Sequence, residues 1–261
     1  MKQLNQYIIE KLKINKSKFK SGPEYTLFPK DKDELKKIIE NEIKQNGNEC
    51  SLNHIDVNKI TDMSFLFSND GQNGYGLHIF NGDMSEWDVS NVTNMRCMFY
   101  KNIYFKGDIS TWDVSSVEDM TYMFSESVFN NNISGWDVSN VIDMDRMFWL
   151  ADFNQDISKW DVSKVKYMSY MFSRSDFNQD ISQWNVSNVE DMRGMFCLSK
   201  FNQDISQWDV SNVKNMDEMF FNNISFNQDI SNWKINPKCD TYSMFDDTVI
   251  RQKYRPRKTV K

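Results

Sequence analysis

The stretch FNQDISQWDVSNVKNMDEMF, residues 201–220, recurs with small changes along most of the 261-residue chain. Aligning the chain on the tryptophan of this stretch gives a column with intervals of 25, 24, 24, 24, 24 and 25 residues. A fixed period of this length is typical of repeat proteins, in which each copy packs against its neighbours. The column that we expect to form the core consists of Trp87, Trp112, Trp136, Trp160, Trp184, Trp208 and Trp233.

One degenerate copy precedes these seven, with Ile55 in the tryptophan position, and the insertion SNDGQNGYGLHI separates it from Phe80. We therefore predict about eight repeats of 24–25 residues over residues 51–245. About eight apolar side chains per copy, at roughly 2 kcal/mol each, do not offset the cost of ordering 24 residues. A single copy is therefore not expected to fold alone.

The order of apolar residues within one copy suggests two elements. The segment from Ile205 to Val213 matches the leucine-rich-repeat template L-x-x-L-x-L, so its Trp-Asp-Val centre is predicted to be a short strand. The following apolar residues, at i, i+3, i+6 and i+7, indicate a helix of about two turns. Serine followed by glutamate three residues later, at 115–118 and 187–190, is typical of a helix start.

We therefore expect an α/β repeat solenoid. It would be a leucine-rich-repeat-like right-handed coil with a parallel strand stack on the concave face, short helices on the convex face and a helical N-terminal cap. The cap is predicted over residues 23–50, with a helix from Asp33 to about Gln45 that ends at Asn46-Gly47. Four apolar residues share one face of this helix: Leu35, Ile38, Ile39 and Ile43.

The two ends of the chain are basic and the middle is acidic. The formal net charge is −6, yet residues 1–48 carry eleven lysines against seven acids, and residues 251–261 carry six basic residues and no acid. Residues 1–22 are predicted to be an N-terminal arm, either an amphipathic helix that docks on a partner or a loosely ordered segment. Residues 246–261 are predicted to be a basic C-terminal tail.

The chain start has no apolar run of signal-peptide length, and no window approaches a membrane span. We therefore expect a cytoplasmic protein, with a surface or virion location by another route as the alternative. The four cysteines show no C-x-x-C pairing and are expected to be free thiols.

No constellation of residues points to catalysis. The chain has no phosphate-binding glycine loop, and neither His54 nor His78 stands in a metal-ligand spacing. We predict that the protein is not an enzyme and uses no cofactor, metal or small-molecule substrate. Glycoside hydrolysis by stacked carboxylates is the enzymatic alternative. It requires two carboxyl groups with different pKa values, and the identical environments of a repeat do not provide them.

Two acidic columns recur. One precedes the repeat isoleucine, as in Asp156 and Asp180, and is expected to accept backbone amides where the chain turns. The other lies between tryptophan and valine, so on the predicted strand it points outward to the concave face. We predict that this second column binds a partner through Asp88, Asp113, Asp137, Asp161 and Asp209.

The motif WDVSNVxxMxxMFxxSxFN, as in residues 160–178 and 184–202, resembles the repeat of bacterial and mycoplasmal surface proteins of unknown function grouped with BspA-like leucine-rich repeats. The resemblance covers about residues 50–245 and implies adhesion or protein binding on a solenoid. Many members of that group are secreted lipoproteins, and we expect this chain to differ from them because its sequence shows no signal-peptide run and no lipobox cysteine.

The function we predict is a non-catalytic repeat scaffold that binds another macromolecule, a protein with a basic surface. A surface or virion-associated adhesin is the alternative. Nucleic-acid binding through the tail RQKYRPRKTVK is disfavoured, because the acidic body repels phosphate.

Overall fold

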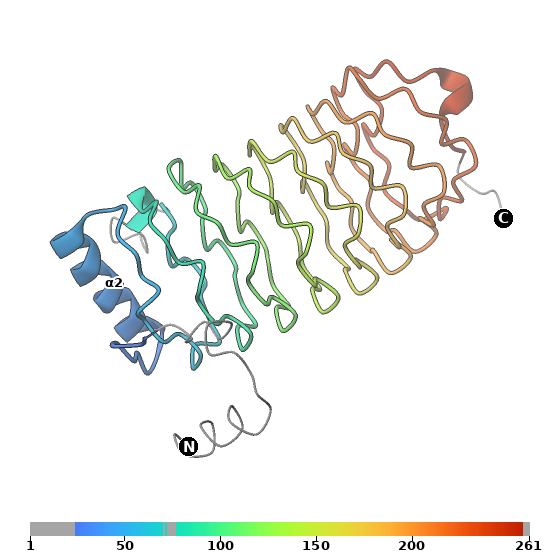
Figure 1. Cartoon of the computed structure of the whole chain (residues 1–261). Helices are drawn as coiled ribbons and strands as arrows, with labels where there is room; N and C mark the ends of the chain where they lie inside the picture. Colours follow the sequence, from blue (N-terminus) through green and yellow to red (C-terminus); the bar gives the residue numbers. More distant parts are fainter. Residues whose placement is uncertain (1–23, 70, 72–76, 258–261) are drawn as a thin grey trace, which may run out of the picture.

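The computed structural model describes residues 24–69, 71 and 77–257 as an elongated stack of coils (Figure 1). The helix α2 (Lys32–Asn46) lies at one end of the stack. Two single-turn 3-10 segments, η2 (Leu77–Ile79) and η3 (Gln252–Tyr254), are the other helical elements of the described chain. The coils between them are built from consecutive turns.

The predicted α/β solenoid is wrong. The described residues form no β-sheet, no strand passes through the Trp-Asp-Val segments, and no helix follows them in any coil. Parallel pairing between coils is limited to isolated bridges, and most of these join the residue before the first methionine of one coil to its equivalent in the next. This column runs through Asp62, Asn94, Asp119, Asp143, Tyr167, Asp191, Asn215 and Asp240.

The region predicted to be helical is instead a surface of stacked turns, which we call the turn wall. In the coil of residues 167–174, the amides of Met168, Tyr170 and Phe172 donate to carbonyls of the next coil at 2.7–3.0 Å. The amides of Met171 and Ser173 close turns within the coil. The equivalent segments of the wall are residues 62–69, 94–101, 119–126, 143–150, 167–174, 191–198, 215–222 and 240–247.

Backbone dihedrals explain why the wall cannot be helical. Tyr170 and Arg174 have φ values of 55° and 56°, in the left-handed region, and equivalent residues in the other coils share this conformation. An α-helix of L-residues excludes such φ values. A two-turn helix would also use its amides internally, whereas here every second amide is bonded to the neighbouring coil.

The serines predicted to cap helices have another role. The Ser115 hydroxyl donates to Asp113 Oδ1 at 2.6 Å, and the Ser115 amide donates to the same oxygen at 3.1 Å. Ser187 makes the same pair of contacts with Asn185. These are Asx turns, which satisfy the backbone locally without a helix.

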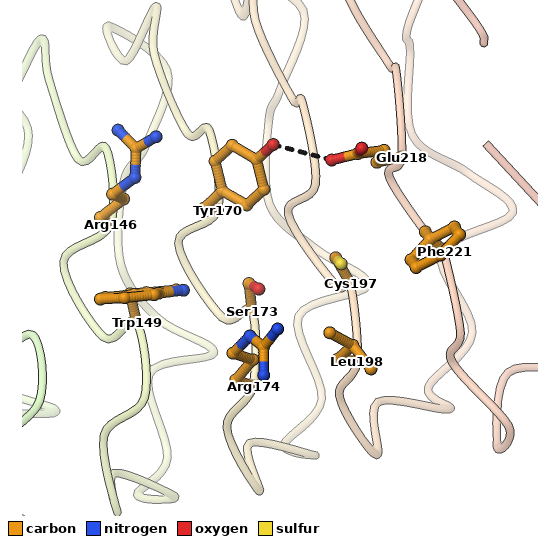
Figure 2. Close-up of a pocket in the computed structure, with 9 residues that line it drawn as sticks. All are labelled: Arg146, Trp149, Tyr170, Ser173, Arg174, Cys197, Leu198, Glu218 and Phe221. Carbon is orange, nitrogen blue, oxygen red and sulfur yellow. Dashed lines mark hydrogen bonds between the residues drawn. The ribbon is translucent and has the colours of Figure 1, made fainter. Parts of the chain in front are cut away.

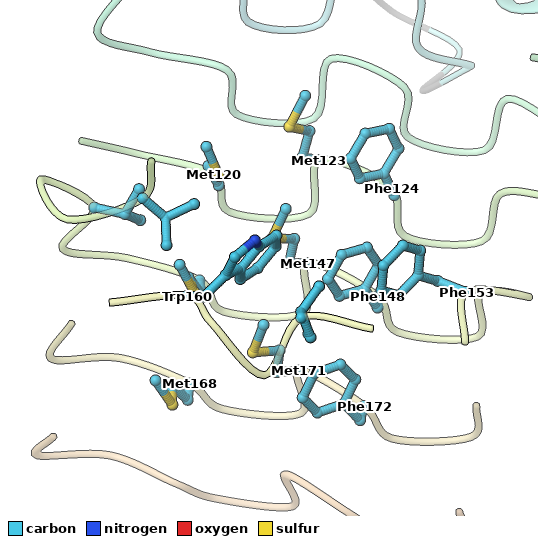
Figure 3. Close-up of a cluster of buried hydrophobic side chains, with 14 of the residues drawn as sticks. Met120, Met123, Phe124, Met147, Phe148, Phe153, Trp160, Met168, Met171 and Phe172 are labelled. Carbon is cyan, nitrogen blue, oxygen red and sulfur yellow. The ribbon is translucent and has the colours of Figure 1, made fainter. Parts of the chain in front are cut away.

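The interior is a set of apolar columns that run along the stack (Figure 3). Phe148 stacks on Phe124 and on Phe172 with ring centroids 5.8 Å apart in both pairs, and Phe153 lies 4.1 Å from Phe148. The methionines beside these rings are fully buried. The Trp, Val, Met and Phe positions of the repeat therefore point inward, as the periodicity required.

The tryptophan column joins consecutive coils. The indole Nε1 of Trp160 donates to the carbonyl oxygen of Ile133 in the preceding coil at 3.2 Å, and Trp160 is only 3 % exposed. The other six tryptophans of the column make the equivalent bond at 2.9–3.1 Å. An indole thus satisfies a buried carbonyl while filling the core.

The helix α2 lies where the sequence predicts a helix and covers the first coil. Asp31 caps its start by accepting the Glu34 amide, and Gly47, at φ 85°, donates to the Ile43 carbonyl at its end. Leu35 and Ile39 are fully buried. The predicted arm, residues 1–22, and the end of the tail, residues 258–261, lie outside the described residues.

Candidate functional site

The predicted aspartate row, Asp88, Asp113, Asp137, Asp161 and Asp209, is exposed on the outside of the coils. Each carboxylate accepts the amide of the serine two residues later, at 3.0–3.2 Å. The row stands on turns and not on the predicted strand stack, so its orientation comes from these local bonds. Whether it binds a partner stays a prediction.

The serine contacts also favour the ionised form of three carboxylates of the row. Hydrogen bonds from the Ser115 hydroxyl and amide lower the pKa of Asp113, and equivalent bonds lower the pKa of Asp161 and of Asp209. These carboxylates therefore stay ionised at neutral pH.

The turn wall carries a second surface that the sequence reading missed. One column of its left-handed residues, which we call the wall row, projects outward from consecutive coils. The Arg146 guanidinium lies between two rings of this row, 5.3 Å from the centroid of Tyr122 and 4.8 Å from that of Tyr170. The row is the part of this column that lies between residues 119 and 222, namely Tyr122, Arg146, Tyr170, Gly194 and Glu218.

Gly194 allows the side chain of Tyr170 to extend across the next coil of the wall row. A Cβ atom at this position would lie 2.2 Å from the Tyr170 ring, so only glycine leaves the ring its place. The Tyr170 hydroxyl reaches over Gly194 and donates to Glu218 Oε2 at 2.8 Å, two coils away. Burial, together with this bond to Glu218, raises the pKa of Tyr170 to about 12, so the phenol stays protonated.

A hollow of about 340 Å³ lies beside the wall row, and we call it the slot (Figure 2). It exists because Ser173 and Cys197 are small, whereas the coils on either side carry Trp149 and Phe221 at the same position. The slot is therefore bounded at each end by an aromatic side chain. Its other lining residues are Arg146, Tyr170, Arg174, Leu198 and Glu218.

The charges around the slot differ from those of the molecule as a whole. Glu218 is engaged by the Tyr170 hydroxyl and lies 4.0 Å from Arg193, which also pairs with Asp217 at 3.2 Å. Within the described part of the chain, neither Arg146 nor Arg174 forms an ion pair with a carboxylate. Two guanidinium groups thus face a small aromatic slot on an acidic protein.

Two half-buried carboxylates, Asp143 and Asp145, lie on the turn wall near Arg146. Burial and the neighbouring Asp143 carboxylate raise the pKa of Asp145 to about 6, although its Oδ1 accepts the Ser169 amide at 2.6 Å. Burial also raises the pKa of Asp143. Both belong to a column of inter-coil contacts, and we assign them a structural role.

No other reactive centre stands out among the described residues. They contain no group of three or more His, Cys, Asp or Glu that could hold a metal ion. None of the four cysteines forms a disulfide bond, as predicted, and three of them are buried. In the same part of the chain, no helix has the length and apolar character needed to cross a membrane.

Comparison with known proteins gives one match. A family model described as Mycoplasma protein of unknown function, DUF285, matches residues 34–152, 127–199 and 176–254. No curated protein and no solved structure matches the chain. The three stretches together run from residue 34 to residue 254, so the family model covers the whole run of repeats.

Proposed function

The chain belongs to this family of Mycoplasma proteins of unknown function, DUF285, and on that premise we propose that it is a non-catalytic repeat scaffold that binds a protein partner. The observation that carries the proposal is the surface formed by the wall row and the slot. Tyrosine, tryptophan and arginine are the residues on which protein interfaces most depend, and here they gather on one face.

The backbone beneath this surface supports the same function. Each side chain of the wall row stands on a turn whose amides and carbonyls are bonded to both neighbouring coils. The Tyr170–Glu218 bond fixes the side chains further. A rigid surface loses little conformational entropy when a partner binds. The likeness to BspA-like leucine-rich repeats adds the same expectation and stays a prediction.

Two candidate faces remain, and one experiment separates them. We propose to capture partners from extracts of the producing cell with three forms of the whole chain: wild type, a wall variant and an aspartate-row variant. The wall variant is Tyr122→Ser with Trp149→Ser and Tyr170→Ser, all at outward positions. The aspartate-row variant, Asp113→Asn with Asp137→Asn and Asp161→Asn, keeps the acceptor oxygens of the turns.

We expect the wild type and the aspartate-row variant to capture the same protein in similar amounts. The wall variant should capture at least tenfold less of it. Thermal unfolding of all three forms checks that the fold is intact. Loss with the aspartate-row variant alone would move the site to the predicted acidic face. Equal retention by all three folded forms would remove both faces as the site.

A further inference from the structure

We infer that the slot binds an acidic peptide segment, inserting one apolar or aromatic side chain of the partner between Trp149 and Phe221 while Arg146 and Arg174 pair with flanking carboxylates. This inference rests on the proposed function and adds the chemistry of the partner. It places a site for acidic ligands on a chain whose formal net charge is −6.

The slot is two coils long, which leaves room for one inserted side chain against either aromatic end. Trp149 and Phe221 are three coils apart, and the two small residues between them, Ser173 and Cys197, form its floor. Tyr170 lies along one side and Leu198 along the other. Aromatic end walls favour an apolar or aromatic occupant, since ring pairs gain about 0.5–1.5 kcal/mol beyond their buried area.

The charge of the slot selects an acidic partner. The carboxylate of Glu218 is already bonded to the Tyr170 hydroxyl, so it offers little to a ligand. The guanidinium of Arg146 is held by the faces of two tyrosine rings, and these contacts leave its N–H donors available. Arg174 is exposed at the rim of the slot and makes no ion pair with the described carboxylates. Arginine forks match carboxylate geometry.

The eight tryptophans provide a local readout, because the seven of the repeat column are only 3–4 % exposed. Trp149, which is partly exposed, is the one that a neutral quencher such as acrylamide reaches first. A peptide seated in the slot shields its indole. Trp149→Phe keeps an aromatic end wall and removes the fluorescence of this indole. If the protection from acrylamide disappears with it, the protected tryptophan is Trp149.

The test measures fluorescence anisotropy of a fluorescein-labelled pentapeptide in which two glutamates flank a central phenylalanine on each side. Two further peptides replace the phenylalanine by serine or all glutamates by lysine. The whole chain is compared with the double variant Arg146→Gln and Arg174→Gln. A second double variant, Lys159→Gln and Lys200→Gln, removes the same charge at exposed positions outside the slot.

We expect the glutamate–phenylalanine peptide to bind and to protect Trp149 from acrylamide, the serine peptide to bind at least fivefold more weakly, and the lysine peptide not to bind. The arginine variant should lose at least tenfold in affinity and the lysine variant less than twofold. Absence of binding to the wild type, or equal binding to both variants, would overturn the inference. The capture experiment is independent of this result. If the peptide does not bind but the wall variant still fails to capture the protein that the wild type captures, the proposed function stands and only the inference is overturned.

Discussion

The indole of each repeat tryptophan does two things that no aliphatic side chain can do together. It fills the interior, and its Nε1 donates a second hydrogen bond to a carbonyl of the preceding coil that already accepts a turn amide. Leucine, the usual residue of repeats of this length, has no donor. The backbone of the Trp-Asp-Val segments is not paired between coils, so the indole supplies a cross-link there.

Replacing Trp160 by phenylalanine tests this role. The change keeps an aromatic ring and removes the indole donor, so the Ile133 carbonyl keeps only the hydrogen bond from the Trp136 amide of its own coil. We expect a loss of about 1–3 kcal/mol in the free energy of unfolding, from the lost hydrogen bond between coils and the smaller ring. The measurement is the shift of the urea midpoint for the whole chain.

Met171→Leu is the matched control for this change. It alters a fully buried side chain in the same part of the stack without changing its polarity, and should cost less than about 1.5 kcal/mol. Equal losses for Trp160→Phe and Met171→Leu would show that the indole bond contributes nothing.

The buried columns could be predicted from the sequence because repetition at 24 residues forces equivalent residues into register. The tryptophan, valine, methionine and phenylalanine positions all point inward. The donor role of the indole could not be predicted in this way. It depends on a carbonyl 27 residues earlier, which accepts a turn amide of its own coil and the indole as well.

The turn wall shows how an element was misread. The spacing of Val213, Met216 and Met219 fits one face of a helix, and it fits equally a chain that turns every three residues. The deciding feature, a left-handed φ at Glu218 and Asn222, has no signature in those residue types. Gly194 is the one glycine in the wall row, and it marks a conformation that the neighbouring coils adopt without glycine.

Asp145 gives the wall a pH dependence. Its folded pKa of about 6 is raised above the ordinary value of 3.8, so the fold favours the protonated carboxyl. The stabilisation is fully present below pH 3.8 and is lost as the pH rises through about 6. We therefore expect Asp145→Asn, which keeps the Oδ1 acceptor for the Ser169 amide, to stabilise the protein at pH 7.5 by on the order of 2 kcal/mol.

The check for this prediction is the urea midpoint at pH 7.5 and at pH 4, where the gain should be much smaller. Asp152→Asn removes a carboxylate that is exposed, and should show no gain at either pH. A destabilised Asp145→Asn protein at pH 7.5 would mean that the ionised carboxylate strengthens the wall.

At the scale of the molecule, the stack combines uniform interior columns with outward positions that vary from coil to coil. The aspartate row could be predicted because it recurs in nearly every copy. The slot could not, because it arises where consecutive coils differ: Trp149, then Ser173 and Cys197, then Phe221. A search for outward positions that break the repeat with arginine or an aromatic residue would have found these residues.

The α2 cap was predictable for a different reason. A helix of 15 residues is long enough for its apolar pattern and its C-terminal Gly47 to be distinctive. The apolar pattern in each coil covers only about two helical turns, which is too short to distinguish a helix from other turns. Sequence reasoning therefore succeeded where one element is long and failed where many short turns depend on their neighbours.

The central claim is that the coils are joined through the turn wall and not through a strand stack. Amide hydrogen exchange, measured residue by residue on the whole chain by NMR, tests this most directly. We predict strong protection at Met168, Tyr170 and Phe172, whose amides donate to the next coil, and fast exchange at Asp161, which makes no backbone ladder bond in the described structure. Strong protection along the Trp-Asp-Val segments, with a continuous helical pattern after them, would contradict the account.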